Sequence, residues 1–225
     1  MEHSAMFWLK KFTSLSKENL KDWIKVIEPE KNSDKQKHII SYLQWNLKKG
    51  AVDIPCYSSS SIQDVLWSEI LSCCTKSSPS NENTEVVNIL APLTDNPNAP
   101  DEDGKTPIYW AALNGHTDII KILAPLTDNP NAPNMYGVTP IRNAARNGHA
   151  EIVQTLVSFT DNVNVRSNLG YTPIFWAAYY GHTEIVKILI PLTRNPNAPI
   201  KKGGTPSSVA KNEEIREILE YRKQY

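Results

Sequence analysis

The stretch GKTPIYWAALNGH, residues 104–116, decides the fold because close copies of it return at a fixed spacing. GVTPIRNAARNGH begins at Gly137, GYTPIFWAAYYGH at Gly170 and a shortened GGTP at Gly203, so that each step is 33 residues. The loop sequence LAPLTDNPNAP, residues 90–100, also recurs at 123–133 and, with two substitutions, at 189–199. A repeat of this length is typical of a solenoid, in which each unit buries its apolar face against its neighbours.

Each unit is predicted to form two helices joined by a tight turn. Thr106 suits an N-cap and Pro107 suits the first helical position. Ala111 lies on the apolar face of this helix, and Gly115 ends it with a positive φ angle. A second helix with an acidic first turn follows. The expected helices span residues 106–114 and 117–125, 139–147 and 150–158, and 172–180 and 183–191.

The pattern TPIxxAAxxGH at this period resembles the ankyrin repeat. The resemblance implies an all-α solenoid of stacked helix-turn-helix repeats, with few or no strands. It also implies that turn tips and first helices line a concave groove where a partner protein binds. The chain departs from the family pattern at Pro92, Pro125 and Pro191, near the ends of the second helices, and proline there should end or kink each helix early.

The repeat register predicts the organisation of the chain. Repeats are expected at 101–133, 134–166 and 167–199, followed by a C-terminal capping repeat at 200–225 with a polar outer face, in which two serines open the first helix. Residues 47–100 are interpreted as a degenerate repeat with an insertion near 75–83, whose second helix lies within 84–93. Residues 1–46 are expected to form a helical N-terminal extension or cap. The alternative is a separate helical effector module that the repeats bring to a target.

Composition narrows the classes of function. Lys and Arg number 24 and Asp and Glu also number 24, and this zero net charge argues against a nucleic-acid partner. No run of about 20 apolar residues predicts a membrane span, and the opening MEHSAMFWLKKF has too short an apolar run for a signal peptide. The three cysteines, two of them adjacent, fit a reducing compartment, so an intracellular location, cytoplasmic or nuclear, is expected.

Catalytic and metal sites are not predicted. His116, His149 and His182 occupy equal places in successive repeats, but packed helices lie about 8–10 Å apart, too far for their side chains to share a zinc ion. They are interpreted as turn-stabilising residues. No phosphate-loop, nucleophile-elbow or zinc-protease motif occurs, so we expect neither enzyme activity nor a cofactor. An enzyme site within residues 1–80 remains as an alternative.

Positions that differ between repeats indicate where a partner would bind. The framework is nearly constant, whereas the turn tips and exposed columns of the first helices change from acidic through aromatic to basic. Trp, Tyr and Arg are the usual anchors of protein interfaces. Alternatively, the tryptophans pack sideways between repeats. We expect a chain that is monomeric on its own and contacts its partner through Glu102, Asp103, Trp110, Leu113, Met135, Tyr136, Arg142, Arg146, Leu169, Tyr171, Phe175, Trp176, Tyr179, Tyr180, Lys201 and Lys202.

Overall fold

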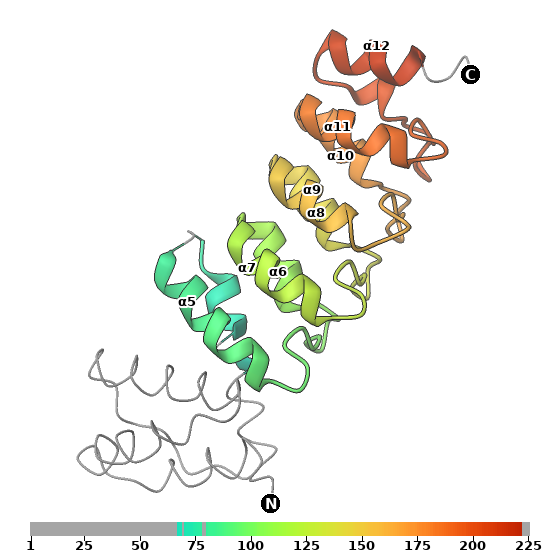
Figure 1. Ribbon diagram of the computed structural model, residues 1–225. Helices are drawn as coiled ribbons and strands as arrows, with labels where there is room; N and C mark the ends of the chain where they lie inside the picture. Colours follow the sequence, from blue (N-terminus) through green and yellow to red (C-terminus); the bar gives the residue numbers. More distant parts are fainter. Residues whose placement is uncertain (1–66, 69, 78–79, 222–225) are drawn as a thin grey trace, which may run out of the picture. The chain divides into compact units, whose positions relative to one another are not determined.

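The computed structural model describes residues 67–68, 70–77 and 80–221 (Figure 1). The helical extension predicted for residues 1–46, and the part of the degenerate repeat before residue 67, lie outside these ranges. The chain divides into two compact units, Met1–Cys73 with Ser80–Pro97 and Cys74–Pro79 with Asn98–Tyr225. Within the described ranges the secondary structure is helical and contains no strand, as the all-α prediction requires.

The described part of the first unit centres on helix α5, Asn81–Leu90, which continues into the 3-10 turn η2, Ala91–Leu93. Ser80 caps α5, because its hydroxyl accepts a hydrogen bond of 3.1 Å from the backbone N–H of Asn83. Val87 is fully buried. The second helix predicted within residues 84–93 is confirmed, although it begins earlier than expected, because the cap lies at Ser80.

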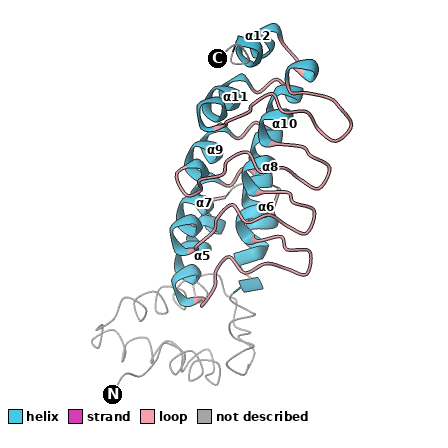
Figure 2. Ribbon diagram, turned by 90° about the vertical axis from the view of Figure 1, so that its right-hand side faces the viewer, coloured by secondary structure: helices cyan, strands magenta, loops and turns pink. Residues whose placement is uncertain are grey.

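The second unit is a stack of helix pairs that follow one another along the chain. In Figure 2 the first helices of the pairs form one column, the second helices form another, and the hairpin loops project past the first helices. This arrangement confirms the predicted helix-turn-helix repeats. The pairs are α6, Pro107–Asn114, with α7, Thr117–Leu123; α8, Pro140–Asn147, with α9, Ala150–Val157; and α10, Pro173–Tyr180, with α11, Thr183–Leu189.

The start of each first helix explains the repeated NPNAP loop. Pro107 opens α6 and has no N–H to satisfy. The next N–H, of Ile108, donates to the side-chain oxygen of Asn98 at 2.9 Å, and the N–H of Tyr109 donates to the hydroxyl of Thr106 at 3.1 Å. These N–H groups of the first turn, which have no acceptor within the helix, are therefore satisfied by side chains. The same contacts recur with Asn131 and Thr139 at α8 and with Asn164 and Thr172 at α10.

These loop asparagines should not contribute equally to stability. Asn131 is 3% exposed and accepts the hydrogen bond of Ile141 at 3.0 Å, whereas half-buried Asn164 lies 3.5 Å from the equivalent N–H of Ile174. Asn131→Ala leaves a buried N–H without an acceptor and should lower the free energy of unfolding by about 1–3 kcal/mol. Asn164→Ala should cost clearly less. Urea denaturation of both variants measures the difference, and equal losses would show that the hydrogen bond is not the cause.

The turn between the paired helices requires glycine for two reasons. Gly115 has a φ angle of 82°, which L-residues with a side chain rarely adopt. In addition, a Cβ atom placed there would lie 2.9 Å from Cε1 of His149 in the following repeat. Gly148 and His182 repeat this contact at 2.8 Å. The glycine turn thus both ends the first helix and receives the histidine of the next repeat.

The prolines near the ends of the second helices have the predicted effect. α7 ends at Leu123 and passes into the 3-10 turn η3, Ala124–Leu126, which contains Pro125. α11 likewise gives way to the 3-10 turn η4, Ile190–Leu192, at Pro191. The middle repeat has Ser158 at this place, and there α9 continues to Val157 with no 3-10 segment. Proline is therefore the local cause of the early end.

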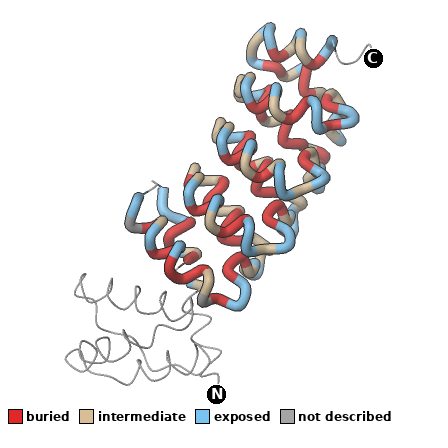
Figure 3. The backbone as a smooth tube through the Cα atoms, viewed as in Figure 1, coloured by how far each residue is buried: buried red, intermediate tan, exposed pale blue. Residues whose placement is uncertain are grey.

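The core of the stack lies where the helices face one another (Figure 3). Each first helix presents an isoleucine and two adjacent alanines to this core, and the small alanine side chains let neighbouring helices approach closely. Buried aliphatic residues of the second helices complete it. The fully buried residues of the first helices are Ile108, Ala111, Ala112, Ile141, Ala144, Ala145, Ile174, Ala177 and Ala178.

The fourth copy differs from the prediction. Its first helix is reduced to a single 3-10 turn, η5, Ser207–Val209, which ends at Ala210 with φ −58° and ψ 125°. The last helix, α12, Glu213–Tyr221, buries Ile215 and Leu219 and exposes its glutamates. Such a helix suits the polar outer face expected of a capping repeat, and the assignment of 200–225 as a cap stays a prediction.

Candidate functional site

The turn tips of the second unit form a row of hairpins that are fixed to one another. In the second tip, the side-chain oxygen of Asn134 accepts hydrogen bonds from the N–H groups of Tyr136 and Val138 at 3.0 and 2.9 Å. Between tips, the N–H of Met135 donates to the carbonyl of Asp103 at 3.0 Å. The equivalent bond between the next two tips runs from Asn168 to Tyr136, also at 3.0 Å. The side chains on these tips therefore stand on a backbone that is already ordered.

The middle tips carry the large apolar side chains that differ between the repeats and were therefore predicted to contact a partner. Met135 is 59% exposed, Tyr136 is 54% exposed and Leu169 is 62% exposed. Because the loop backbone is already ordered, a partner that covers these exposed side chains causes little further loss of backbone conformational entropy. These three residues, with Tyr179 of α10, which is 49% exposed, form the apolar part of the candidate site.

Helix α10 and the tip before it assemble an aromatic cluster. The ring of Trp176 stacks on that of Tyr180, with centroids 5.9 Å apart and planes inclined by 19°. Tyr171 lies 5.0 Å from Trp176 on a tilted plane, and Tyr179 meets Trp176 edge to face at 5.8 Å. Trp176 is half-buried at the centre of this group. The ring packs between repeats, as the alternative interpretation expected, and its contact with a partner stays a prediction.

Phe175 is a correction to the predicted site. It is 5% exposed and lies 5.0 Å from Tyr171 in an edge-to-face contact. Its place in a variable column suggested an exposed anchor, but its ring faces the interior and supports Tyr171 instead. Phe175 therefore belongs to the core, and the contact of a partner with Tyr171 stays a prediction.

Two arginines of the preceding repeat lie on this aromatic cluster. The guanidinium carbons of Arg142 and Arg146 lie 4.9 and 5.2 Å from the ring centroid of Trp176, and that of Arg146 is 5.9 Å from the ring of Tyr180. These are cation–π distances. Comparison of the repeats found each arginine separately, and the structure brings these side chains of α8 and α10 together.

The two ends of the row differ in charge, as predicted. At the first tip Glu102 is exposed, while Asp103 forms an ion pair with Lys105. The ammonium group of Lys105 also lies 5.4 Å from the ring of half-buried Trp110. Leu113, at the end of the same helix, is half-buried. At the last tip Lys201 and Lys202 are exposed.

The histidines of the repeats have the predicted role in the turns. Nε2 of His116 lies 2.8 Å from the carbonyl oxygen of Lys76, and Nε2 of His182 lies 3.1 Å from that of Arg146. His149 forms the equivalent bond with the backbone of Leu113. Each histidine thus ties a turn to the repeat before it. Within the part of the chain that the structure describes, no three metal-binding side chains come together.

Stability should depend on pH through His149. Burial lowers the pKa of His149 below its ordinary value; the backbone bond to Leu113 partly opposes this, and the charges of His182 and His116 lower the pKa further. The unfolded chain, with a pKa of about 6.5, then binds the proton more readily than the folded chain. The contribution of neutral His149 to stability is therefore fully present above the pKa of the unfolded chain. It is lost as the pH falls through that pKa toward the lower pKa of the folded chain.

We expect the melting temperature, followed by circular dichroism, to fall between about pH 7.5 and about pH 5.5. The variant His149→Gln should show a shallower fall over the same interval, whatever its absolute stability. An unchanged slope would exclude His149 as the source of the dependence.

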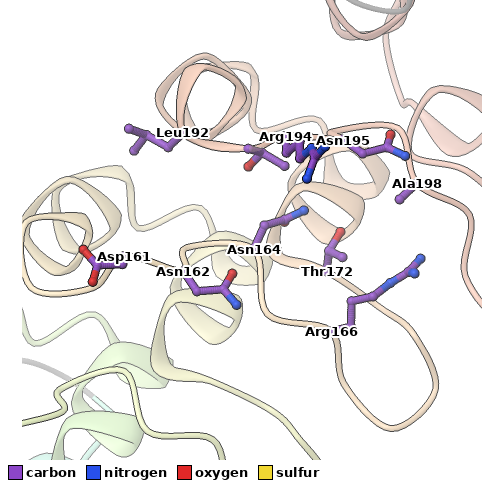
Figure 4. A pocket seen from close by; sticks show the side chains of 10 residues that line it. Asp161, Asn162, Asn164, Arg166, Thr172, Leu192, Arg194, Asn195 and Ala198 are labelled. Carbon is purple, nitrogen blue, oxygen red and sulfur yellow. The ribbon is translucent and has the colours of Figure 1, made fainter.

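A separate hollow of about 420 Å³ lies between the loops that follow α9 and α11 (Figure 4). Several of its polar groups already serve the fold. Asn164 lies at the start of α10, and the guanidinium of Arg166 donates to the carbonyl of Pro199. The residues that line it include no paired nucleophile and base. The hollow is therefore a weaker candidate for the binding site than the aromatic cluster of α10. It is lined by Asp161, Asn162, Asn164, Arg166, Thr172, Leu192, Thr193, Arg194, Asn195 and Ala198.

Comparison with known proteins agrees with this architecture. A family model described as ankyrin repeats matches the chain in three overlapping copies, at residues 72–167, 123–200 and 144–221. Together these matches cover residues 72–221, or 150 of the 225 residues. No relative among the curated proteins matches the chain. No helix in the described ranges is long and apolar enough to cross a membrane.

Proposed function

The chain belongs to the ankyrin-repeat family, and from this premise we propose that it binds a partner protein through its turn tips and first helices. Ankyrin repeats are in general protein–protein interaction modules. The observation that carries the proposal is the exposure of Met135, Tyr136, Leu169 and Tyr179, each about half exposed and held on hydrogen-bonded tips or on α10. Exposed apolar patches on a folded protein usually mark a contact surface.

The mechanism is a rigid scaffold whose binding face changes along the stack. The tips run from acidic, at Glu102 and Asp103, through apolar side chains to basic, at Lys201 and Lys202. A partner of matching charge order would bind in one direction, because the reversed orientation places like charges together. We propose a scaffold, adaptor or inhibitor rather than an enzyme, without a cofactor, within a reducing intracellular compartment.

Paired substitutions at exposed apolar positions test the proposal. Met135→Glu with Leu169→Glu alters the tips, whereas Leu126→Glu with Leu192→Glu alters the 3-10 turns after α7 and α11, which are 45% and 50% exposed. Proteins captured from a cell extract by the wild-type chain should be lost with the first pair and retained with the second. Loss with the second pair alone would move the interface away from the tips.

The second candidate function is a regulator whose N-terminal region is a separate effector module. The division of the chain into two compact units supports it in part, since the first unit contains Met1–Cys73 but also Ser80–Pro97 with α5. Limited proteolysis distinguishes the two designs. A resistant fragment that begins near residue 80 supports a separate module, and protection that begins near residue 15 supports a single continuous stack.

A further inference from the structure

Resting on the proposed function, we infer that the partner presents an acidic side chain, Asp or Glu, to the pair Arg142 and Arg146 beside Trp176. The two arginines lie four residues apart on α8 and therefore share one side of the helix. Both guanidinium carbons lie within 5.2 Å of the ring centroid of Trp176. The site is thus one double cation on an aromatic surface.

This positive charge has no neutralising group within the described part of the chain. The ion pairs there join Lys105, Lys121, Lys187 and Arg216 to carboxylates, and none includes Arg142 or Arg146. Burial, followed by the nearby charge of Arg146, lowers the pKa of Arg142. The free chain therefore holds two like charges together, and an anion at this place would relieve the repulsion.

Hydrogen bonding gives a second, independent observation. Nε of Arg142, Nδ2 of Asn143 and Nε1 of Trp176 are buried N–H donors with no acceptor within the described residues. Asn143 is 1% exposed, and its side-chain oxygen already accepts a bond of 3.3 Å from Arg142. A buried donor without an acceptor is costly. The cluster therefore has more N–H donors than acceptors, which adds to its positive potential. These three atoms are enclosed, so a partner's acceptor would meet the outer guanidinium groups of Arg142 and Arg146 instead.

A carboxylate fits this cluster better than a phosphate group. Proteins commonly bind phosphate with the free N–H groups at a helix start. At α8 these groups are engaged, since the N–H of Ile141 donates to Asn131 and that of Arg142 donates to Thr139. The remaining donors are side-chain groups, mainly guanidinium, which pair with carboxylate and phosphate alike through two parallel hydrogen bonds. The preference for carboxylate therefore rests on the engaged helix start and on the apolar surroundings. The exposed ring of Tyr179 beside them favours an acidic residue with apolar neighbours.

Three pools of synthetic peptides test this assignment on the full chain. The central residue is Glu, Gln or phosphoserine, and the flanking positions are mixtures of apolar residues. Binding is followed by the NMR signal of the Trp176 indole N–H, which the variant Trp176→Phe identifies. A charge-assisted contact should make the Glu pool bind about tenfold more tightly than the Gln pool.

The variant Arg142→Gln with Arg146→Gln should lose this preference. The matched control, Arg166→Gln with Arg194→Gln, removes the same charge from exposed arginines of the loops after α9 and α11, and should keep it. Melting temperatures check that both variants fold.

The Glu and Gln pools could bind equally well, with both affinities weakened by Tyr179→Ala. That result would overturn the carboxylate assignment and leave the proposed binding face in place. A stronger phosphoserine pool would also overturn it. If no pool shifts the Trp176 signal, the inference fails, while the capture experiment with the tip variants decides the proposed function separately.

Discussion

Ala111→Asp is expected to destabilise the repeat stack by several kcal/mol, because it places an unpaired charge at a fully buried position of α6. A domain is stable by only about 5–15 kcal/mol, so this loss is a large fraction of the total. Ala111 lies on the helix that packs on α7 within its repeat and on α8 of the next. The damage should therefore spread across two repeats.

The matched control is Ala150→Asp, the same chemical change at the first residue of α9. Ala150 is half-buried at a helix start, where the helix dipole favours a negative charge. Its free energy of unfolding should change by no more than about 0.5 kcal/mol. Urea denaturation of both variants measures the difference. Equal midpoints would mean that the helix faces are assigned wrongly.

The second large effect is expected on binding. Tyr179→Ala should weaken the affinity for the captured partner by about 2 kcal/mol, because tyrosines at the centre of an interface are frequent hot spots. Tyr179 is 49% exposed, so its removal should cost no more stability than about 0.5–1.5 kcal/mol, the contribution of an aromatic pair such as its contact with Trp176. Tyr180 is less suitable alone, because it stacks on Trp176 and lies 6.2 Å from the ring of His182. The double variant should therefore lose both affinity and some stability.

Phe159→Ala is the aromatic control for Tyr179→Ala. Phe159 is 38% exposed and follows the end of α9, outside the candidate site. Isothermal titration with the partner should give an affinity near that of the wild type for Phe159→Ala and a much lower one for Tyr179→Ala. The reverse order would place the interface on the second helices.

The local signals in the sequence predicted the helices well. Thr-Pro before each first helix and glycine after it act within a few residues, so their effect does not depend on the rest of the fold. The effect of Pro125 is equally local. The fourth copy was predicted to lack about three residues around its turn, but the reduction of its first helix to a 3-10 turn was not, because Ser207 and Ser208 could serve either as a helix start or as a turn.

Contacts between residues far apart in the chain could not be predicted from the sequence pattern. The Asn98 side chain caps a helix ten residues further along, and a loop asparagine usually bonds to nearby backbone instead. Asn114 has the register of an exposed helix end, yet it is half-buried and its side chain donates to the carbonyl of Cys74 at 3.0 Å. The Arg142–Trp176 contact joins two repeats, and a column-by-column comparison treats its members separately.

The most direct test of the binding face is hydroxyl-radical footprinting of the chain with and without its partner. Exposed Met, Tyr and Leu side chains are labelled in the free chain, and binding should protect those that the partner covers. We expect protection of Met135, Tyr136, Leu169 and Tyr179, with unchanged labelling of Leu126 and Leu192, which are similarly exposed in the free chain. Protection of Leu126 and Leu192 with unchanged labelling of the tips would contradict it.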